Sequence, residues 1–283
     1  MPKYILHPQT VQQLEAMGSR PPHAVLVAGQ PGIGKATVAI TLAEQALNLA
    51  EGKLATYPYA RHIRPVDNKA IGIENIRELE HFLSLKIPGS KPISRVVIIE
   101  DAHLMTTESQ NALLKQLEEP PADTVIILTS AHEQALLPTI RSRVQTLMVK
   151  KPGQPEVMLF FAGRAAESEV KQAVAISGGL PGLTAAMLSG DEAHPLMEAV
   201  STARHLLQAT PYERMLKVDD LAKQREASRD MCFVLMQMAH TAIANGSPSP
   251  RWQNILQAAY TAQEQLLASG QPKLVLSNLM LNL

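Results

Sequence analysis

The stretch GQPGIGKAT, residues 29–37, decides the fold of the first half of the chain. Gly29, four intervening residues, Gly34 and Lys35 fit the phosphate-binding loop pattern G-x-x-x-x-G-K-[ST] up to its last position. That position should carry a hydroxyl that binds Mg²⁺, but Ala36 stands there. The segment predicts a nucleotide-phosphate site. It leaves open whether the site hydrolyses ATP, only binds it, or merely keeps the shape of such a site.

The candidate nucleotide-binding residues belong to this loop and to the first helical turn after it. They are Gly29, Pro31, Gly32, Gly34, Lys35, Ala36 and Thr37. Backbone N–H groups of the loop and the helix N-terminus are expected to surround phosphate oxygens, with Lys35 reaching the outer phosphates. Thr37 lies about 100° further round the helix than Ala36, so it replaces the missing hydroxyl poorly, although a water could complete the metal's shell. The alternative is a glycine-rich turn that binds no ligand.

The composition is that of a globular chain long enough for two or three domains, with 283 residues, 46% hydrophobic and 18% charged. Lys and Arg together number 26, as do Asp and Glu, so any nucleic-acid contact is expected to be shared with partners. The single cysteine, Cys232, excludes a disulfide framework and a cysteine-rich zinc site and fits a reducing cytoplasm. Neither a signal peptide nor a membrane-spanning segment is expected.

Strand and helix patterns alternate through the first half of the chain. Buried strands are predicted over 23–29, 95–100, 124–130 and 144–149, which are short apolar runs. Helices are predicted over 35–50, 73–86 and 107–119, the last opened by Thr107 and Gln110 in capping-box spacing. Continuous apolar strands that alternate with helices predict an α/β domain with a parallel sheet covered on both faces.

Only helical patterns follow residue 150. KKPGQP, residues 150–155, ends the first domain, and the helical sequence from 156 to 188 is interrupted by SGGLPG, residues 177–182. SGDEAHP, residues 189–195, is a second linker. We therefore expect three domains, 1–150, 151–190 and 191–283, of which the first is α/β and the other two are helical.

Two acids and a threonine follow apolar strands. Glu100 and Asp101 end the run VVIIED, and Thr129 ends a neighbouring strand, so all three are expected at the carboxyl edge of the sheet beside the loop. The usual order is Asp then Glu, where the first acid assists Mg²⁺ and the second activates water. Asp101 as the base is one methylene short, and an error of about 1 Å can cost about a hundredfold in rate. One of the acids could instead be solvated. Thr129, or Ser130 after it, could sense the γ-phosphate, although this signal alone is weak because Ser and Thr end many strands.

Two arginines in TIRSRVQ, residues 139–145, are further candidates. Arg143 could stabilise phosphate charge on a neighbouring subunit, as an arginine finger does, while Arg141 braces the loop from within. Taken by themselves, these residues favour a solvated surface pair.

The segment from Val96 to Arg143 resembles the clamp-loader subunits of bacterial DNA polymerase III. Its stretches NALLKQLEEPP and LLPTIRSR are similar to those of the delta-prime and gamma/tau subunits, which are AAA+ proteins related to replication factor C. IGIENIRELEHFLSLKI, ISGGLPGLTAAML and PKLVLSNLMLNL resemble the helix before the acidic strand, the second-sensor region of the lid and the last collar helix. The resemblance implies an AAA+ P-loop domain, a small helical lid and an all-helical collar.

Departures from the family pattern favour a delta-prime-like subunit over a gamma/tau-like motor. Three elements of the chain's own hydrolytic site are altered: Ala36, the Glu100–Asp101 order, and Pro181, near which ATP-hydrolysing relatives carry an arginine. Arg143, which would serve a neighbour's site, is retained, although the cysteine that follows it in the family is Val144 here. The cysteines of the family's zinc module are absent, so no zinc is expected.

The resemblance implies a subunit that completes the clamp-loader ring, supplies Arg143 to the adjacent ATPase and helps load the sliding clamp. The implied partners are gamma/tau-like and delta-like subunits, the sliding clamp and primer-template DNA, whose backbone would lie near the helix starts at Ile73 and Thr107. ATP or ADP is the expected ligand, with Mg²⁺ weakly held and the chain's own ATPase weak or absent. The alternatives are an active gamma/tau-type ATPase and a scaffold that binds no nucleotide.

The last helical segment is expected to drive assembly. Its leucines are Leu274, Leu276, Leu279 and Leu281, more apolar surface than a terminal helix needs. The alternative is that about half of them pack inside the chain's own core.

Overall fold

The computed structural model describes residues 4–65, 70–85, 87, 91–246 and 249–283. Two compact units divide the chain, residues 1–151 and 152–283, and each is described by itself. Within the described ranges no helix combines the length and apolar character needed to cross a membrane. The same ranges contain no group of three or more His, Cys, Asp or Glu side chains arranged to hold a metal ion.

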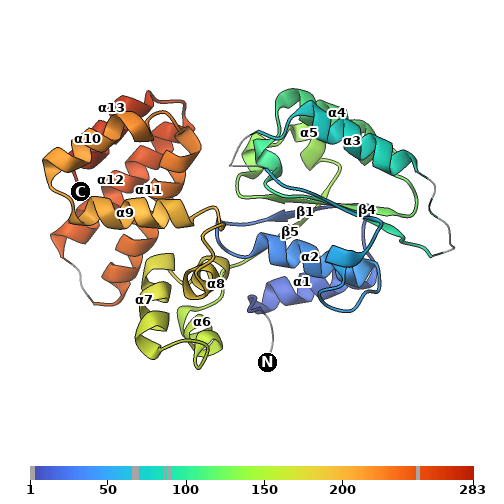
Figure 1. Cartoon of the computed structure of the whole chain (residues 1–283), viewed down its shortest axis with the longest axis horizontal. Coiled ribbons are helices and arrows are strands. Elements are labelled where there is room, and N and C mark those ends of the chain that lie inside the picture. Colours follow the sequence, from blue (N-terminus) through green and yellow to red (C-terminus); the bar gives the residue numbers. More distant parts are fainter. Residues whose placement is uncertain (1–3, 66–69, 86, 88–90, 247–248) are drawn as a thin grey trace. The chain divides into compact units, whose positions relative to one another are not determined.

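A parallel sheet forms the centre of the first unit, and its described strands follow the order β2-β3-β4-β1-β5 (Figure 1). The strands are β1 (Ala24–Ala28), β2 (Ala60–Ile63), β3 (Arg95–Ile99), β4 (Thr124–Ser130) and β5 (Gln145–Met148). Every residue of β1, β3 and β4 is buried, as expected for a sheet covered on both faces. The four predicted strands are confirmed, and β2 was not predicted.

Helices cover the two faces of this sheet. They are α1 (Pro8–Ser19), α2 (Lys35–Ala46), α3 (Ile73–Ser84), α4 (Thr107–Glu118) and α5 (Pro138–Arg141), with short 3-10 turns η1 (Leu54–Thr56), η2 (Ala102–Leu104) and η3 (Glu133–Ala135). In Figure 1, α1 and α2 lie on one side of the sheet and α3, α4 and α5 on the other. One core cluster joins alternate strand residues, such as Leu26, Ile99 and Ile126, to Ile76 of α3 and Leu113 of α4. The predicted AAA+-type α/β layering is therefore present.

Two helix boundaries differ from the prediction. α2 ends at Ala46 and not near residue 50, because Asn48 has a φ of 52°, in the left-handed region that ends a helix. The predicted capping box at Thr107 is wrong: Thr106 is the N-cap, and its side chain accepts from the N–H of Ser109 at 3.2 Å. Gln110 is buried and binds the backbone of residues 105, 135 and 137, so its amide is unavailable to cap the helix.

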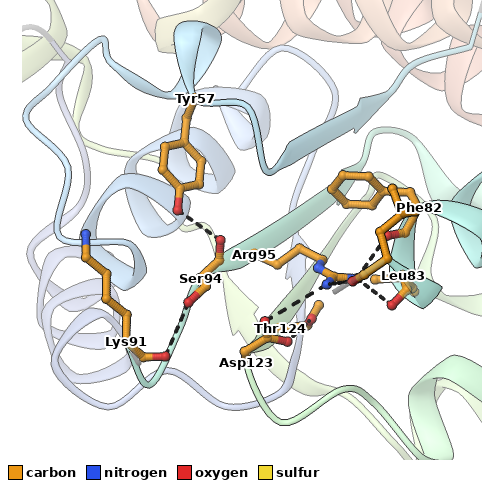
Figure 2. A network of polar contacts seen from close by, with 9 residues as sticks. Tyr57, Phe82, Leu83, Lys91, Ser94, Arg95, Asp123 and Thr124 are labelled. Carbon is orange, nitrogen blue, oxygen red and sulfur yellow. Dashed lines mark hydrogen bonds and ion pairs between the residues drawn. The ribbon is translucent and has the colours of Figure 1, made fainter. Parts of the chain in front are cut away.

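A buried arginine joins the sheet to the end of α3 (Figure 2). Arg95, at the start of β3, donates to the backbone oxygens of Phe82 at 2.9 Å, of Leu83, and of Leu85 at 2.6 Å. The last carbonyls of a helix have no donor in the following turn, so the guanidinium supplies donors there, beside the N–H of Leu85, which donates to the oxygen of Phe82 at 3.4 Å. Asp123 lies 4.0 Å from the guanidinium, and the ring of Phe82 lies 5.3 Å from its carbon. The hydrogen bonds of this one arginine therefore help to hold the end of α3 beside the start of β3.

The second unit is helical throughout its described residues. Its helices are α6 (Gln154–Phe161), α7 (Glu167–Ser177), α8 (Pro181–Ser189), α9 (Met197–Gln208), α10 (Pro211–Leu221), α11 (Arg225–Ala244), α12 (Pro250–Leu267) and α13 (Pro272–Leu281). The break between α6 and α7, over 162–166, was missed by the sequence pattern. α11 packs against α7, α9 and α12 and carries the buried Met231 and Met238. The division of this unit into a lid and a collar stays a prediction.

The four leucines of α13 separate into two pairs. Leu276 and Leu279 are buried, whereas Leu274 and Leu281 are 66% and 70% exposed. α13 packs against α10 and α12, whose own apolar side chains include the exposed Leu216. The alternative that half of these leucines belong to the internal core is therefore correct.

Candidate nucleotide-binding site

The phosphate-binding loop lies between β1 and α2, and β1 is flanked by β4 and β5. Gly34 is the N-cap of α2. Its φ is 98°, a backbone conformation that glycine adopts without strain. A Cβ at Gly29 would lie 2.9 Å from the backbone oxygen of Val149, and Gly32 after Pro31 has a φ of 71°. The loop thus depends on its glycines. Because the first helical N–H groups lack intrahelical acceptors, the predicted cradle fits an anion such as a nucleotide phosphate.

Lys35 is positioned at this loop. The residue as a whole is only 8% exposed, and its Nζ donates to the backbone oxygen of Gln30 at 3.1 Å. Asp101 is close enough for the charge of Lys35 to lower the pKa of its carboxyl. A buried ammonium is stabilised by such partners, so the cation stays near the place where a phosphate would bind.

The first turn of α2 has no hydroxyl at the position where the loop pattern expects one. Ala36 is half-buried there, and the next residue, Thr37, is exposed. Since successive helical residues are separated by about 100°, the Thr37 hydroxyl cannot occupy the place that belongs to residue 36. The first turn of α2 therefore offers no hydroxyl to a metal ion at this position, as the sequence predicts.

Glu100 is engaged by one side chain of β2 and by another that directly follows this strand. Its Oε1 lies 2.7 Å from Nε2 of His62 and 3.4 Å from Nε of Arg64. The Glu100 N–H donates to the oxygen of Ile63, which continues the β2–β3 pairing and fixes the acid beside His62. Burial raises the pKa of Glu100, but the hydrogen bond and charge of His62, together with Arg64, outweigh it and hold the pKa below its ordinary value. Glu100 is therefore a paired carboxylate.

Asp101 and Thr129 are joined at the carboxyl ends of β3 and β4. The backbone N–H of Asp101 donates to Oγ1 of Thr129 at 2.9 Å, and Thr129 is 2% exposed. Asp101 has a φ of 46°, in the left-handed region that Asp tolerates better than most residues. Burial raises the pKa of its carboxyl, with Lys35 opposing and Glu100 reinforcing this shift. The arrangement holds Thr129 as a hydrogen-bond acceptor toward the backbone.

Arg143 lies in the turn between α5 and β5. Its Nη2 is 2.7 Å from Oε1 of Glu118 at the end of α4, and Nη1 donates to the oxygen of Thr139 at 3.0 Å. The side chains of Arg143 and Glu118 are 35% and 49% exposed, so this ion pair is partly solvated and contributes little stability. Arg141 donates to Oε1 of Gln134 at 3.2 Å, which agrees with its predicted bracing of the loop.

The structure therefore brings Lys35, Asp101 and Thr129 together, whereas Arg143 contacts Glu118 and Thr139, which belong to another group of residues. Sequence reasoning missed His62 and Arg64. No local signal marks this strand: ARHI has two polar side chains, Arg61 and His62, between its apolar ends, and only its pairing with β3 makes it a strand, which Arg64 follows.

Comparison with known proteins agrees with this architecture. The family model described as DNA polymerase III, delta subunit, matches residues 6–153. The DNA polymerase III subunit delta′ of Pseudomonas aeruginosa is 35% identical over 192 residues, which cover 59% of this chain and 56% of that protein. The delta′ subunit of Escherichia coli is 29% identical over 188 residues, which cover 60% and 55%. The chain thus spans about half the length of the curated relatives that it matches.

A solved structure adds evidence for the fold. The DNA polymerase III gamma subunit-related protein of Thermotoga maritima superposes with a TM-score of 0.51 at 20% identity, over 96% of this chain and 97% of that one. At this identity the likeness concerns the AAA+ fold alone. The family model, however, matches more than half of the chain, and the aligned curated relatives bear the delta′ name. The chain therefore belongs to the delta-prime family of DNA polymerase III clamp-loader subunits.

Proposed function

We propose that this chain acts in the bacterial cytoplasm as a delta-prime-like subunit that helps load the sliding clamp onto primer-template DNA. In this role it completes a ring with gamma/tau-like and delta-like subunits and supplies Arg143 to the neighbouring ATPase. The observation that carries the proposal is an asymmetry. The chain's own site lacks a hydroxyl at Ala36 and has Glu100 paired with His62, whereas the partly exposed Arg143 contacts a partly solvated acid and nearby groups of α5 and its own turn.

The proposal includes weak nucleotide binding with slow turnover. The loop and Lys35 provide donors for phosphate, whereas the metal position has no hydroxyl at Ala36 and Asp101 is one methylene short for a base. The purified chain is therefore expected to bind ATP or ADP by calorimetry and to show steady-state ATPase well below that of an AAA+ motor. Lys35→Ala should remove the binding. ATP hydrolysis at motor rates that Lys35→Ala abolishes would favour the gamma/tau-type alternative.

Assembly is proposed to use the exposed apolar face of the last helices. α10 and α13 are neighbours, and they expose Tyr212, Leu216, Leu274 and Leu281 to between 60% and 73%. Large apolar side chains that are exposed on adjacent helices are typical of a protein contact. We assign this face to the gamma/tau-like partner, since the chain's curated relatives include gamma/tau subunits as well as delta-prime subunits.

Replacing both Leu274 and Leu281 with Glu is expected to abolish co-purification with a gamma/tau-like partner. Each change places a charge in the proposed interface, and desolvating it costs several kcal/mol, about a thousandfold or more in affinity. Because both side chains are exposed, the isolated chain should keep its thermal unfolding midpoint. Deleting residues 272–283 would be a poorer test, since it also removes the buried Leu276 and Leu279.

The matched control is Leu159→Glu, at a leucine that is 78% exposed on α6 in the same unit. It should leave co-purification unchanged. Full assembly of the Leu274→Glu, Leu281→Glu variant would reject the proposed interface, and loss of assembly in the control as well would show a general solubility effect.

Contact with the DNA backbone is proposed at the start of α3 and α4. These two ends adjoin, since the N–H of Ile71 donates to the oxygen of Leu104 and the N–H of Thr106 to the oxygen of Ile71. Glu74 and Glu108, however, place carboxylates in the two first turns, where they already use the positive end of each helix. The contribution of this subunit to DNA affinity is therefore expected to be small.

A further inference from the structure

The fold implies a Mg²⁺ ion beside the nucleotide, and the residues present do not fit it. A P-loop site holds the metal through a hydroxyl at the start of the helix and a carboxylate at the end of the acidic strand. Here the first ligand is replaced by the methyl group of Ala36. The second, Glu100, has a side chain that is 17% exposed and already engaged from β2.

The engagement of Glu100 follows from the strand register. His62 pairs with Ile98, two residues before Glu100, so the two side chains lie on the same face of the sheet. An ionised carboxylate only accepts hydrogen bonds, so Nε2 of His62 donates the 2.7 Å contact. Arg64 adds a charge at 3.4 Å from the same oxygen, and its own side chain is 60% exposed. A metal ion bound at Glu100 would have to share the carboxylate with the imidazole and the guanidinium, which already take up its Oε1 oxygen.

The charges around the loop already balance without a dication. Glu100 faces Arg64, and the carboxyl of Asp101 interacts with the ammonium of Lys35. A dication placed between these groups would be repelled by Lys35 and by Arg64, so its binding would depend on the phosphates of the nucleotide. A phosphate, in contrast, still finds the backbone N–H groups of the loop and Lys35.

We infer that this loop binds nucleotide without Mg²⁺, and that His62 and Arg64 are the residues that keep Glu100 from serving the metal. The inference rests on the nucleotide binding in the proposed function and deepens it. The nucleotide then serves mainly to stabilise the first unit and is turned over slowly at most, because the ion that organises phosphoryl transfer is not held. Assembly with partners does not depend on this inference, so the two can fail separately.

The first test measures ADP binding to the full chain by calorimetry, once with EDTA and once with excess MgCl₂. The affinity with EDTA should equal or exceed the affinity with MgCl₂, because free ADP is the more negative ligand for the loop and Lys35. Tightening by Mg²⁺ of about tenfold or more, a difference of about 1.4 kcal/mol, would overturn the inference. Absence of ADP binding in both buffers would overturn it as well.

The second test builds the missing metal site in two steps. Ala36→Ser restores the hydroxyl but should leave ADP binding insensitive to Mg²⁺, because Glu100 is still held. Adding His62→Ala and Arg64→Ala should make Mg²⁺ tighten ADP binding by about tenfold, since the freed carboxylate and the new hydroxyl provide two oxygen ligands. Thermal unfolding checks that each variant is folded.

Arg61→Ala in the Ala36→Ser background is the matched control, because Arg61 lies on the same strand and pairs with Glu78 at 3.1 Å. It should not create a Mg²⁺ effect. If Ala36→Ser alone makes ADP binding sensitive to Mg²⁺, Glu100 is free to bind the metal. If the folded triple variant, with Ala36→Ser, His62→Ala and Arg64→Ala, shows no Mg²⁺ effect, His62 and Arg64 are not the barrier. Either result contradicts the inference.

Discussion

Arg143→Ala in an assembled complex is expected to lower the ATP turnover of the neighbouring subunit about 10³-fold or more, the range known for arginine fingers in GTPases. A guanidinium keeps its charge and can donate to two phosphate oxygens at once. In the isolated chain Arg143 is held by Glu118 at 2.7 Å, and both side chains are partly exposed. Because a surface ion pair of this kind is weak, Arg143 can leave Glu118 and bind a phosphate on the partner. The measurement is the DNA- and clamp-stimulated ATPase of the complex.

Two further variants make this result specific. Arg143→Lys should recover little of the turnover, because a point charge cannot reproduce the planar fork of a guanidinium. Arg61→Ala removes another exposed arginine that pairs with a glutamate, and it should change nothing. All three complexes should assemble. Unchanged turnover in an intact complex with Arg143→Ala would mean that Arg143 is a solvated surface residue, and the action on a neighbour would have to be abandoned.

Arg95→Met is expected to cost the first unit about 3–5 kcal/mol of unfolding free energy, the range for breaking a buried charged network. The Arg95 side chain is 3% exposed and donates to three backbone oxygens at the end of α3 (Figure 2). Methionine fills similar space but donates no hydrogen bond. It leaves the carbonyls of Phe82, Leu83 and Leu85 without this donor, although Phe82 keeps the N–H of Leu85. A carbonyl that stays buried without any donor costs about 1–3 kcal/mol.

The matched control is Arg77→Met on α3, where the arginine is 61% exposed and pairs with Glu74 at 2.6 Å. Its effect should stay below about 1 kcal/mol, as for other surface ion pairs. Because the chain has two units, hydrogen exchange of peptides from β3 and α3 reports the loss where it occurs, alongside urea unfolding. Similar effects from both variants would show that Arg95 does not cap α3 as described.

Local pattern was enough for much of the α/β unit. β1, β3 and β4 are continuous apolar runs, and such runs predict a sheet buried on both faces before any contact is known. The loop from Gly29 to Lys35 likewise carries its own conformation, because glycines are required where φ is positive or where the backbone approaches Val149. The missing hydroxyl at Ala36 could also be predicted, because the loop pattern requires one residue type at a fixed spacing.

The sequence by itself therefore determined the elements whose signal repeats within a few residues, together with the phosphate loop and its missing hydroxyl. Only the tertiary structure decided that Gln110 binds the segment before α5 and does not cap α4, and that Leu276 and Leu279 are internal while Leu274 and Leu281 are exposed. It also decided the state of Glu100, whose partner His62 lies 38 residues away on a strand with no apolar pattern of its own. Contacts of this kind arise from strand order and packing, and no local period in the chain encodes them.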